Sequence, residues 1–144
     1  MLKNISPILS PDLLHALAAM GHGDEIVLAD GNFPADSHTK LCLRADGHSV
    51  PAVLAAVLTL LPLDTFVESP AMVMDPVDPH PTEPPVWSDF ATIIEAAEGR
   101  AIPLKRIERY AFYERARNAY AIVATGETAL YGNLILKKGV VAPN

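Results

Sequence analysis

The chain has 144 residues, half of them hydrophobic, which suits one compact domain and is too short for two ordinary ones. The formal net charge is −6. The chain therefore lacks the basic excess that nucleic-acid-binding proteins use to neutralise phosphates, and we expect no nucleic-acid partner.

The first half of the sequence predicts two helices and several strands. Ser10 followed by Pro11 is typical of a helix start, and Gly21 supplies the stop. Ser49 is the expected cap of a second helix, which is apolar nearly all round and therefore buried on more than one side. The predicted helices are 11–20 and 50–61, and the strand-like segments are 25–29, 41–43, 65–68 and 72–74.

A proline-rich segment interrupts this pattern. Residues 75–86 read DPVDPHPTEPPV, with five prolines in twelve residues. Such a segment cannot form a regular element, so we predict a surface loop.

The second half alternates helices and strands again. Ser88 is the expected cap of a third helix that Gly99 closes. A fourth helix is expected over 110–118, and further strands over 104–108, 120–125 and 133–137. Alternation of this kind predicts one α/β domain over residues 1–144, with a mostly central sheet flanked by helices in three layers.

The sequence also indicates where the protein works. The longest apolar stretch, 50–63, contains two prolines and falls short of the ~20 residues that a bilayer requires. The N-terminal residues lack the apolar core of a secretory signal. Cys42 is the only cysteine, which excludes an internal disulfide. We expect a cytoplasmic protein without a membrane segment.

Four polar clusters break the apolar pattern. His22 lies between two glycines, where an imidazole suited to proton exchange near neutrality is accessible. Asp30 follows a predicted strand, Arg109 follows another, and Tyr131-Gly132-Asn133 forms a turn between apolar segments.

Each cluster has a plain structural alternative that spacing alone leaves open. His22 could interact with the end of a helix dipole, and Asp30 could serve only an Asx-turn. The aromatic residues near Arg109 could be packing residues, and the Tyr131 segment could be an ordinary turn. The histidines show no metal-ligand spacing, and the sequence contains no P-loop, GxSxG or GxGxxG motif.

Taken in order, these clusters resemble the fucose mutarotase and ribose pyranase family, also called RbsD/FucU-like. The resemblance extends over nearly the whole chain. The segments that carry it are LKNISP at 2–7, MGHGDEI at 20–26, RYAFYERA at 109–116, TGE at 125–127 and YGN at 131–133.

The resemblance implies a mutarotase that interconverts sugar anomers by acid–base ring opening, without a cofactor or metal. His22 corresponds to the catalytic acid, and Asp30, Arg109, Tyr131, Gly132 and Asn133 correspond to sugar-binding positions. The FYERA run and Arg109 resemble the fucose branch, so L-fucose is favoured over D-ribose. The family forms cyclic homo-oligomers, often decamers, with sites at subunit contacts. The alternatives are a ribose pyranase and a non-catalytic monosaccharide-binding accessory protein.

Overall fold

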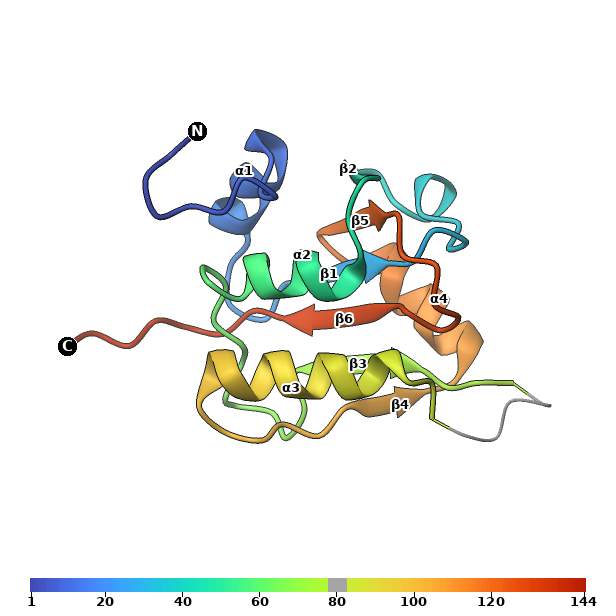
Figure 1. The fold of residues 1–144 in the computed structure, drawn as a ribbon. Helices are drawn as coiled ribbons and strands as arrows, with labels where there is room; N and C mark the ends of the chain where they lie inside the picture. The colour runs from blue at the N-terminus through green and yellow to red at the C-terminus, as the bar shows by residue number, and fades with distance from the viewer. Residues whose placement is uncertain (78–82) are drawn as a thin grey trace.

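A mixed β-sheet organises the protein. The computed structural model describes residues 1–77 and 83–144, and within them the chain forms six strands. These are β1 (Glu25–Ala29), β2 (Cys42–Ala45), β3 (Ala71–Met74), β4 (Lys105–Ile107), β5 (Ala121–Thr125) and β6 (Leu134–Lys137). They form one sheet in the order β2-β5-β1-β6-β3-β4 (Figure 1).

The strand directions bring distant parts of the sequence to one edge. β5 is parallel to both β1 and β2, and β3 is parallel to β4. β6 is antiparallel to β1 and to β3. Five strands therefore end at the same edge, and β6 begins there. Ligands of α/β sheets gather beyond the carboxyl ends of strands, so this edge is where a site is expected.

Helices cover the two faces of the sheet unequally. The helices are α1 (Pro11–Ala19), α2 (Val50–Val57), α3 (Val86–Glu98) and α4 (Arg109–Asn118), with a short 3-10 turn, η1, at Asp36–His38. α2 and α3 lie side by side across one face, and α4 lies on the other (Figure 1). This arrangement confirms the predicted three-layer α/β fold.

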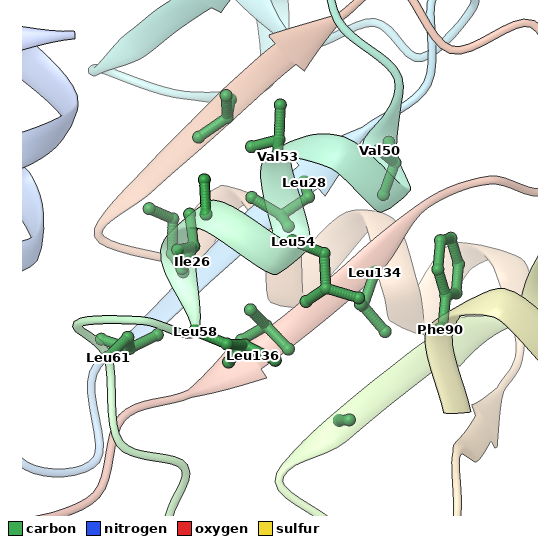
Figure 2. Close-up of a cluster of buried hydrophobic side chains, with 14 of the residues drawn as sticks. Ile26, Leu28, Val50, Val53, Leu54, Leu58, Leu61, Phe90, Leu134 and Leu136 are labelled. Atoms are coloured by element: carbon green, nitrogen blue, oxygen red, sulfur yellow. The ribbon is translucent and has the colours of Figure 1, made fainter. Parts of the chain in front are cut away.

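The larger core lies between the sheet and the helices α1, α2 and α3. Ile26, Leu28 and Leu134 point from the sheet toward Leu54 of α2 and Phe90 of α3 (Figure 2), and all five side chains are fully buried. The alternate strand residues pack on the other face against α4. This alternation is the period of two that a strand imposes on its side chains.

Three of the predicted helix boundaries are confirmed. Ser10 Oγ accepts the N–H of Leu13 and Ser49 Oγ accepts the N–H of Ala52, so both serines cap their helices. Gly99 ends α3 with φ of 72°, a left-handed conformation that glycine adopts without steric cost.

Other expectations are corrected by the structure. α3 begins at Val86, directly after Pro85, so Ser88 lies in its first turn and is not the cap. Prolines suit this start because the first turn of a helix leaves its N–H groups without helical partners. α1 ends at Ala19, and Met20 caps it with extended backbone, so the helix does not use Gly21 as a left-handed stop. Residues 65–68 form bends and no strand, and α2 ends at Val57.

The predicted proline loop is only partly described. Residues 78–82 lie outside the described residues, and the flanking residues 75–77 and 83–84 form no helix or strand. Val86, which the sequence pattern places in the loop, belongs to α3. Within the described ranges, no helix combines the length and apolarity needed to cross a membrane.

Candidate functional site

Two of the predicted site residues form a buried pair at the carboxyl edge of the sheet. Asp30 directly follows β1, and Asn133 directly precedes β6. Asn133 Oδ1 accepts the Asp30 N–H at 2.8 Å, and Asn133 Nδ2 donates to Asp30 Oδ2 at 3.1 Å. The pair is 6% and 4% exposed. Mutual hydrogen bonds fix both side chains, as burial of polar groups requires.

The Asp30 carboxyl carries more hydrogen bonds than an Asx-turn needs. Burial raises its pKa above the ordinary value, and backbone N–H groups of Asn32, Phe33 and Gly132, with the Asn133 amide, act in the opposite direction. The N–H of Asn32 is the local turn contact, at 3.0 Å from Oδ1. The contacts to Gly132 and Asn133 come from the far end of the chain, so Asp30 organises a tertiary site.

The turn between Tyr131 and Asn133 is tightly constrained. Tyr131 adopts φ of 57°, a region that non-glycine residues rarely occupy. A Cβ on Gly132 would lie 2.9 Å from Glu127 Cγ and 3.0 Å from the Ala129 carbonyl, so the position requires glycine. The Tyr131 carbonyl accepts the indole N–H of Trp87 at 3.0 Å. Strained backbone held by tertiary contacts is typical of functional sites.

Arg109 reaches the same edge as the first residue of α4, just after β4. Its Nη2 donates to the Tyr110 hydroxyl at 2.9 Å, and its guanidinium lies 4.8 Å from the centre of the Tyr110 ring. Its Nε is buried and has no hydrogen-bond partner among the described residues. An unsatisfied buried donor is costly, and a ligand oxygen would satisfy it.

These side chains line one cavity of about 260 Å³. The predicted site residues Asp30, Arg109, Tyr131 and Asn133 are among its lining residues. Its other lining residues are Asn32, Phe33, Met74, Tyr113 and Leu130. The Phe33 and Tyr113 rings lie 5.5 Å apart, next to each other in this wall. Directional polar groups beside apolar rings suit a small polyhydroxylated molecule with one apolar face. We call this cavity the binding pocket.

His22 does not reach the binding pocket of its own chain. It precedes β1, whereas Asp30 follows β1, and the five residues of that strand span about 17 Å at about 3.3 Å per residue. Its side chain is 44% exposed. The ring lies 5.1 Å from that of Phe66, and Nε2 lies 3.1 Å from Asp64 Oδ1. Within a single chain, the predicted acid therefore lies far from the predicted binding residues.

The loop that carries His22 is held by the C-terminal end of β6. The Gly23 N–H donates to the Lys138 carbonyl, and the Lys138 N–H donates to the Asp24 carbonyl, both at 2.8 Å. The Lys138 ammonium donates to the carbonyls of Leu17 and Met20 at the end of α1. Lys138, and not His22, therefore meets the negative end of that helix, which removes the helix-dipole explanation for the histidine.

Asp64 was not identified from the sequence. It is buried and lies 42 positions after His22 in the sequence, so only the fold brings the two together. The sequence offers only a weak indication of Asp64 as a site residue, namely that its carboxylate follows the apolar segment Leu61-Pro62-Leu63. Burial of an ionisable group at such a position points to a partner.

Comparison with known proteins identifies a matching family and similar sequences. The profile of the RbsD / FucU transport protein family matches residues 3–141. Fucose mutarotase of Homo sapiens is 57% identical over 149 residues, which cover 99% of this chain and 96% of that protein. L-fucose mutarotase of Histophilus somni is 49% identical over 140 residues and covers 97% of each chain.

A solved structure is similar over its full length. The fucose mutarotase of Streptococcus pneumoniae, crystallised in complex with L-fucose, superposes with a TM-score of 0.93 at 47% identity. The match covers 98% of this chain and 100% of that one. The six-stranded sheet and the position of its carboxyl edge therefore recur in a protein that binds a monosaccharide.

Proposed function

The chain belongs to the RbsD / FucU transport protein family, and on that premise we propose that it interconverts the α and β anomers of L-fucose. It is then an isomerase, a fucose mutarotase whose substrate is a free monosaccharide. The observation that carries this assignment is its identity of 49–57% to proteins named fucose mutarotase, over nearly all of both chains. The binding pocket agrees with it, because its polar and aromatic lining suits a sugar.

Mutarotation requires little machinery. A proton is delivered to the ring oxygen as the C1–O bond breaks, and the anomeric hydroxyl loses its proton as C1 becomes a carbonyl. Rotation about C1–C2 and reclosure then give the other anomer. In this proposal Asp30, Arg109, Tyr131 and Asn133, with the Gly132 backbone, hold the sugar hydroxyls. His22 is the acid, and the base is a second side chain or a water molecule. The reaction is neither redox nor phosphate transfer, so no cofactor is needed.

We further propose that the working site contains two copies of the chain. His22 lies at one end of β1 and the binding pocket at the other, so the acid for each pocket has to come from a neighbour. Phe66, 74% exposed, lies beside His22, and Leu130, 61% exposed, lines the binding pocket. Exposed apolar residues at both ends of the molecule favour contact between these two surfaces.

Such contacts join unlike surfaces, the His22 end of one copy and the pocket end of the next. Head-to-tail contacts generate closed rings when the rotation between copies closes. A second cavity, of about 360 Å³, lies toward the amino end of β3 on the face that α4 covers, and Val67 and Lys137 are among its lining residues. We take this cavity as part of the surface that meets the neighbour. A cyclic homo-oligomer, such as a decamer, is the assembly we expect.

Two further proposals concern the extent of the domain and the location of the protein in the cell. We treat residues 1–144 as one mutarotase domain, since the family profile runs from residue 3 to residue 141. We place the enzyme in the cytoplasm, where a chain with a single cysteine needs no disulfide.

The direct test is saturation-transfer NMR on α- and β-L-fucose, with ribose and galactose as comparison sugars. We expect the protein to accelerate fucose exchange above the buffer rate, and to act more strongly on fucose than on ribose. Exchange of all three sugars at the buffer rate would leave the non-catalytic binding protein as the better explanation. Faster exchange of ribose than of fucose would instead indicate a ribose pyranase.

Arg109→His is expected to reduce fucose turnover more than ribose turnover. The guanidinium presents several fixed donors, and one of them, Nε, is buried without a partner among the described residues. An imidazole supplies at most two donors, so a sugar that depends on the guanidinium loses more. We expect kcat/KM for fucose to fall by about tenfold or more, which corresponds to about 1.4 kcal/mol. Arg117→His, at an exposed position of the same helix, is the matched control. Equal losses on both sugars would contradict a selective role for Arg109.

A further inference from the structure

Tyr131, one of the proposed sugar-binding residues, is held by two other segments of the chain. Its carbonyl accepts the indole N–H of Trp87 at 3.0 Å, and its hydroxyl accepts the N–H of Val77 at 3.3 Å. Val77 follows β3, and Trp87 is the second residue of α3. Both donors lie far from Tyr131 in the sequence, so the fold directs them at one residue of the binding pocket.

The bond from Trp87 fixes the peptide group between Tyr131 and Gly132. The carbonyl of this group is that of Tyr131, and its N–H belongs to Gly132 and donates to the Asp30 carboxyl. Because a peptide group is planar, hydrogen bonds at both of its ends fix its orientation. Tyr131 precedes the group with φ of 57°, a left-handed conformation that persists only where surrounding contacts impose it. Trp87 supplies one of these contacts.

Trp87 is itself held in place. It is 3% exposed and belongs to the core between the sheet and the helices. The Arg106 guanidinium lies 5.3 Å from the centre of its ring, and Arg106 Nε donates to Asp75 Oδ1 at 2.7 Å. An indole has one hydrogen-bond donor and no acceptor. The donor that meets the Tyr131 carbonyl therefore comes from a well-packed wall and not from a mobile surface group.

We propose that Trp87 is a positioning residue for sugar binding. Its N–H holds the peptide group that joins Tyr131 to Gly132, so that the Tyr131 side chain and the Asp30 carboxyl stay where they bind the sugar. This inference rests on the proposed mutarotase function. Trp87 is outside the described lining of the binding pocket, so it acts through these residues. Groups that hold the sugar equally in the ground state and the transition state affect KM and leave kcat unchanged.

The first test is Trp87→Phe, which removes the donor and keeps an aromatic ring in the core. We expect KM for fucose exchange to rise at least about fivefold, as for the loss of one buried hydrogen bond, while kcat stays within about twofold. Phe90→Leu is the matched control, because it removes a fully buried ring from the same helix and leaves the indole in place. It should lower Tm and keep KM within about twofold. A wild-type KM in Trp87→Phe, or an equal rise in Phe90→Leu, would overturn the proposal.

A second variant separates the hydrogen bond from the packing of the ring. Trp87 is the only tryptophan of the chain, so incorporation of a tryptophan analogue changes this position alone. β-(3-Benzothienyl)alanine has sulfur in place of the indole N–H and nearly the same shape, and we expect it to raise KM as Trp87→Phe does. 5-Fluorotryptophan keeps the N–H and should retain the wild-type KM. A wild-type KM with the sulfur analogue would show that only the packing of the ring matters.

A crystal structure of Trp87→Phe tests the positioning without any activity. We expect the Tyr131 carbonyl to turn from its wild-type direction and the Tyr131 side chain to shift within the binding pocket. An unchanged Tyr131 would refute the positioning role, whatever the activity of the variant. Exchange at the buffer rate in the wild-type protein would instead refute the mutarotase function, and the crystal structure would still decide whether Trp87 positions Tyr131.

Discussion

His22→Ala is expected to lower the rate of fucose anomer exchange by about 10²–10⁴-fold, which is the usual contribution of a general acid or base. The uncatalysed reaction already proceeds in water, so the variant should approach the buffer rate. The sugar should still bind, because the side chains proposed to hold its hydroxyls lie in the separate binding pocket. The fold should be intact, because the imidazole is 44% exposed and buried Asp64 retains its hydrogen bond from the Phe66 N–H.

Three measurements make this expectation specific. Saturation-transfer NMR gives the exchange rate, ligand-observed NMR gives fucose binding, and circular dichroism with thermal unfolding reports the fold. His15→Ala is the control, since it removes an exposed imidazole from α1. Unchanged exchange in His22→Ala would exclude this residue as the acid. Loss of binding together with exchange would instead indicate that His22 holds the sugar.

The binding edge was predictable because its residues follow from local rules. Asp30 stands at the end of an apolar run, and Asn133 stands at the beginning of another, so both belong to strand ends. Ligand sites of α/β sheets lie at such ends, and the turn chemistry of Gly132 marks the place where the backbone bends. The sequence could not reveal that β6 runs antiparallel between β1 and β3, which is what brings the start of one strand beside the ends of the others.

The acid end was predictable only in part. Two glycines around His22 indicate an accessible loop, but its partner Asp64 comes from a segment where local preference was misleading. Residues 65–68 are rich in strand-forming types, but they form bends, and the Phe66 N–H donates to the side chain of Asp64 two residues earlier. Aspartate side chains that bond the backbone two residues on compete with strand pairing, and here the local bond accompanies the bend. The same contact creates the carboxylate partner that the sequence did not show.

Within one chain, the proposed acid His22 lies a strand length away from the binding pocket. If each working site combines the His22 end of one copy with the binding pocket of the next, two different inactive variants can restore one another. His22→Ala retains a complete binding pocket, and Asp30→Asn retains a complete acid end. A site formed by the pocket of the first variant and His22 of the second contains no substitution at all.

Co-assembly of His22→Ala with Asp30→Asn at equal amounts is therefore expected to restore about a quarter of the wild-type exchange rate, since each side of a head-to-tail site is intact in half of the subunits. The variants would be co-expressed with two different tags and purified on both in succession, so that only mixed assemblies are assayed. Each variant alone gives the baseline. A pairing of Asp30→Asn with Asn133→Ala supplies the matched control: both substitutions impair the binding pocket, so no combination of subunits forms an intact site and no gain is expected. Failure of the first pairing to exceed its baseline, in assemblies shown to contain both tags, would mean that His22 does not act on a neighbour's pocket. Because His22 lies a strand length away from its own pocket, that result would also remove it as the acid.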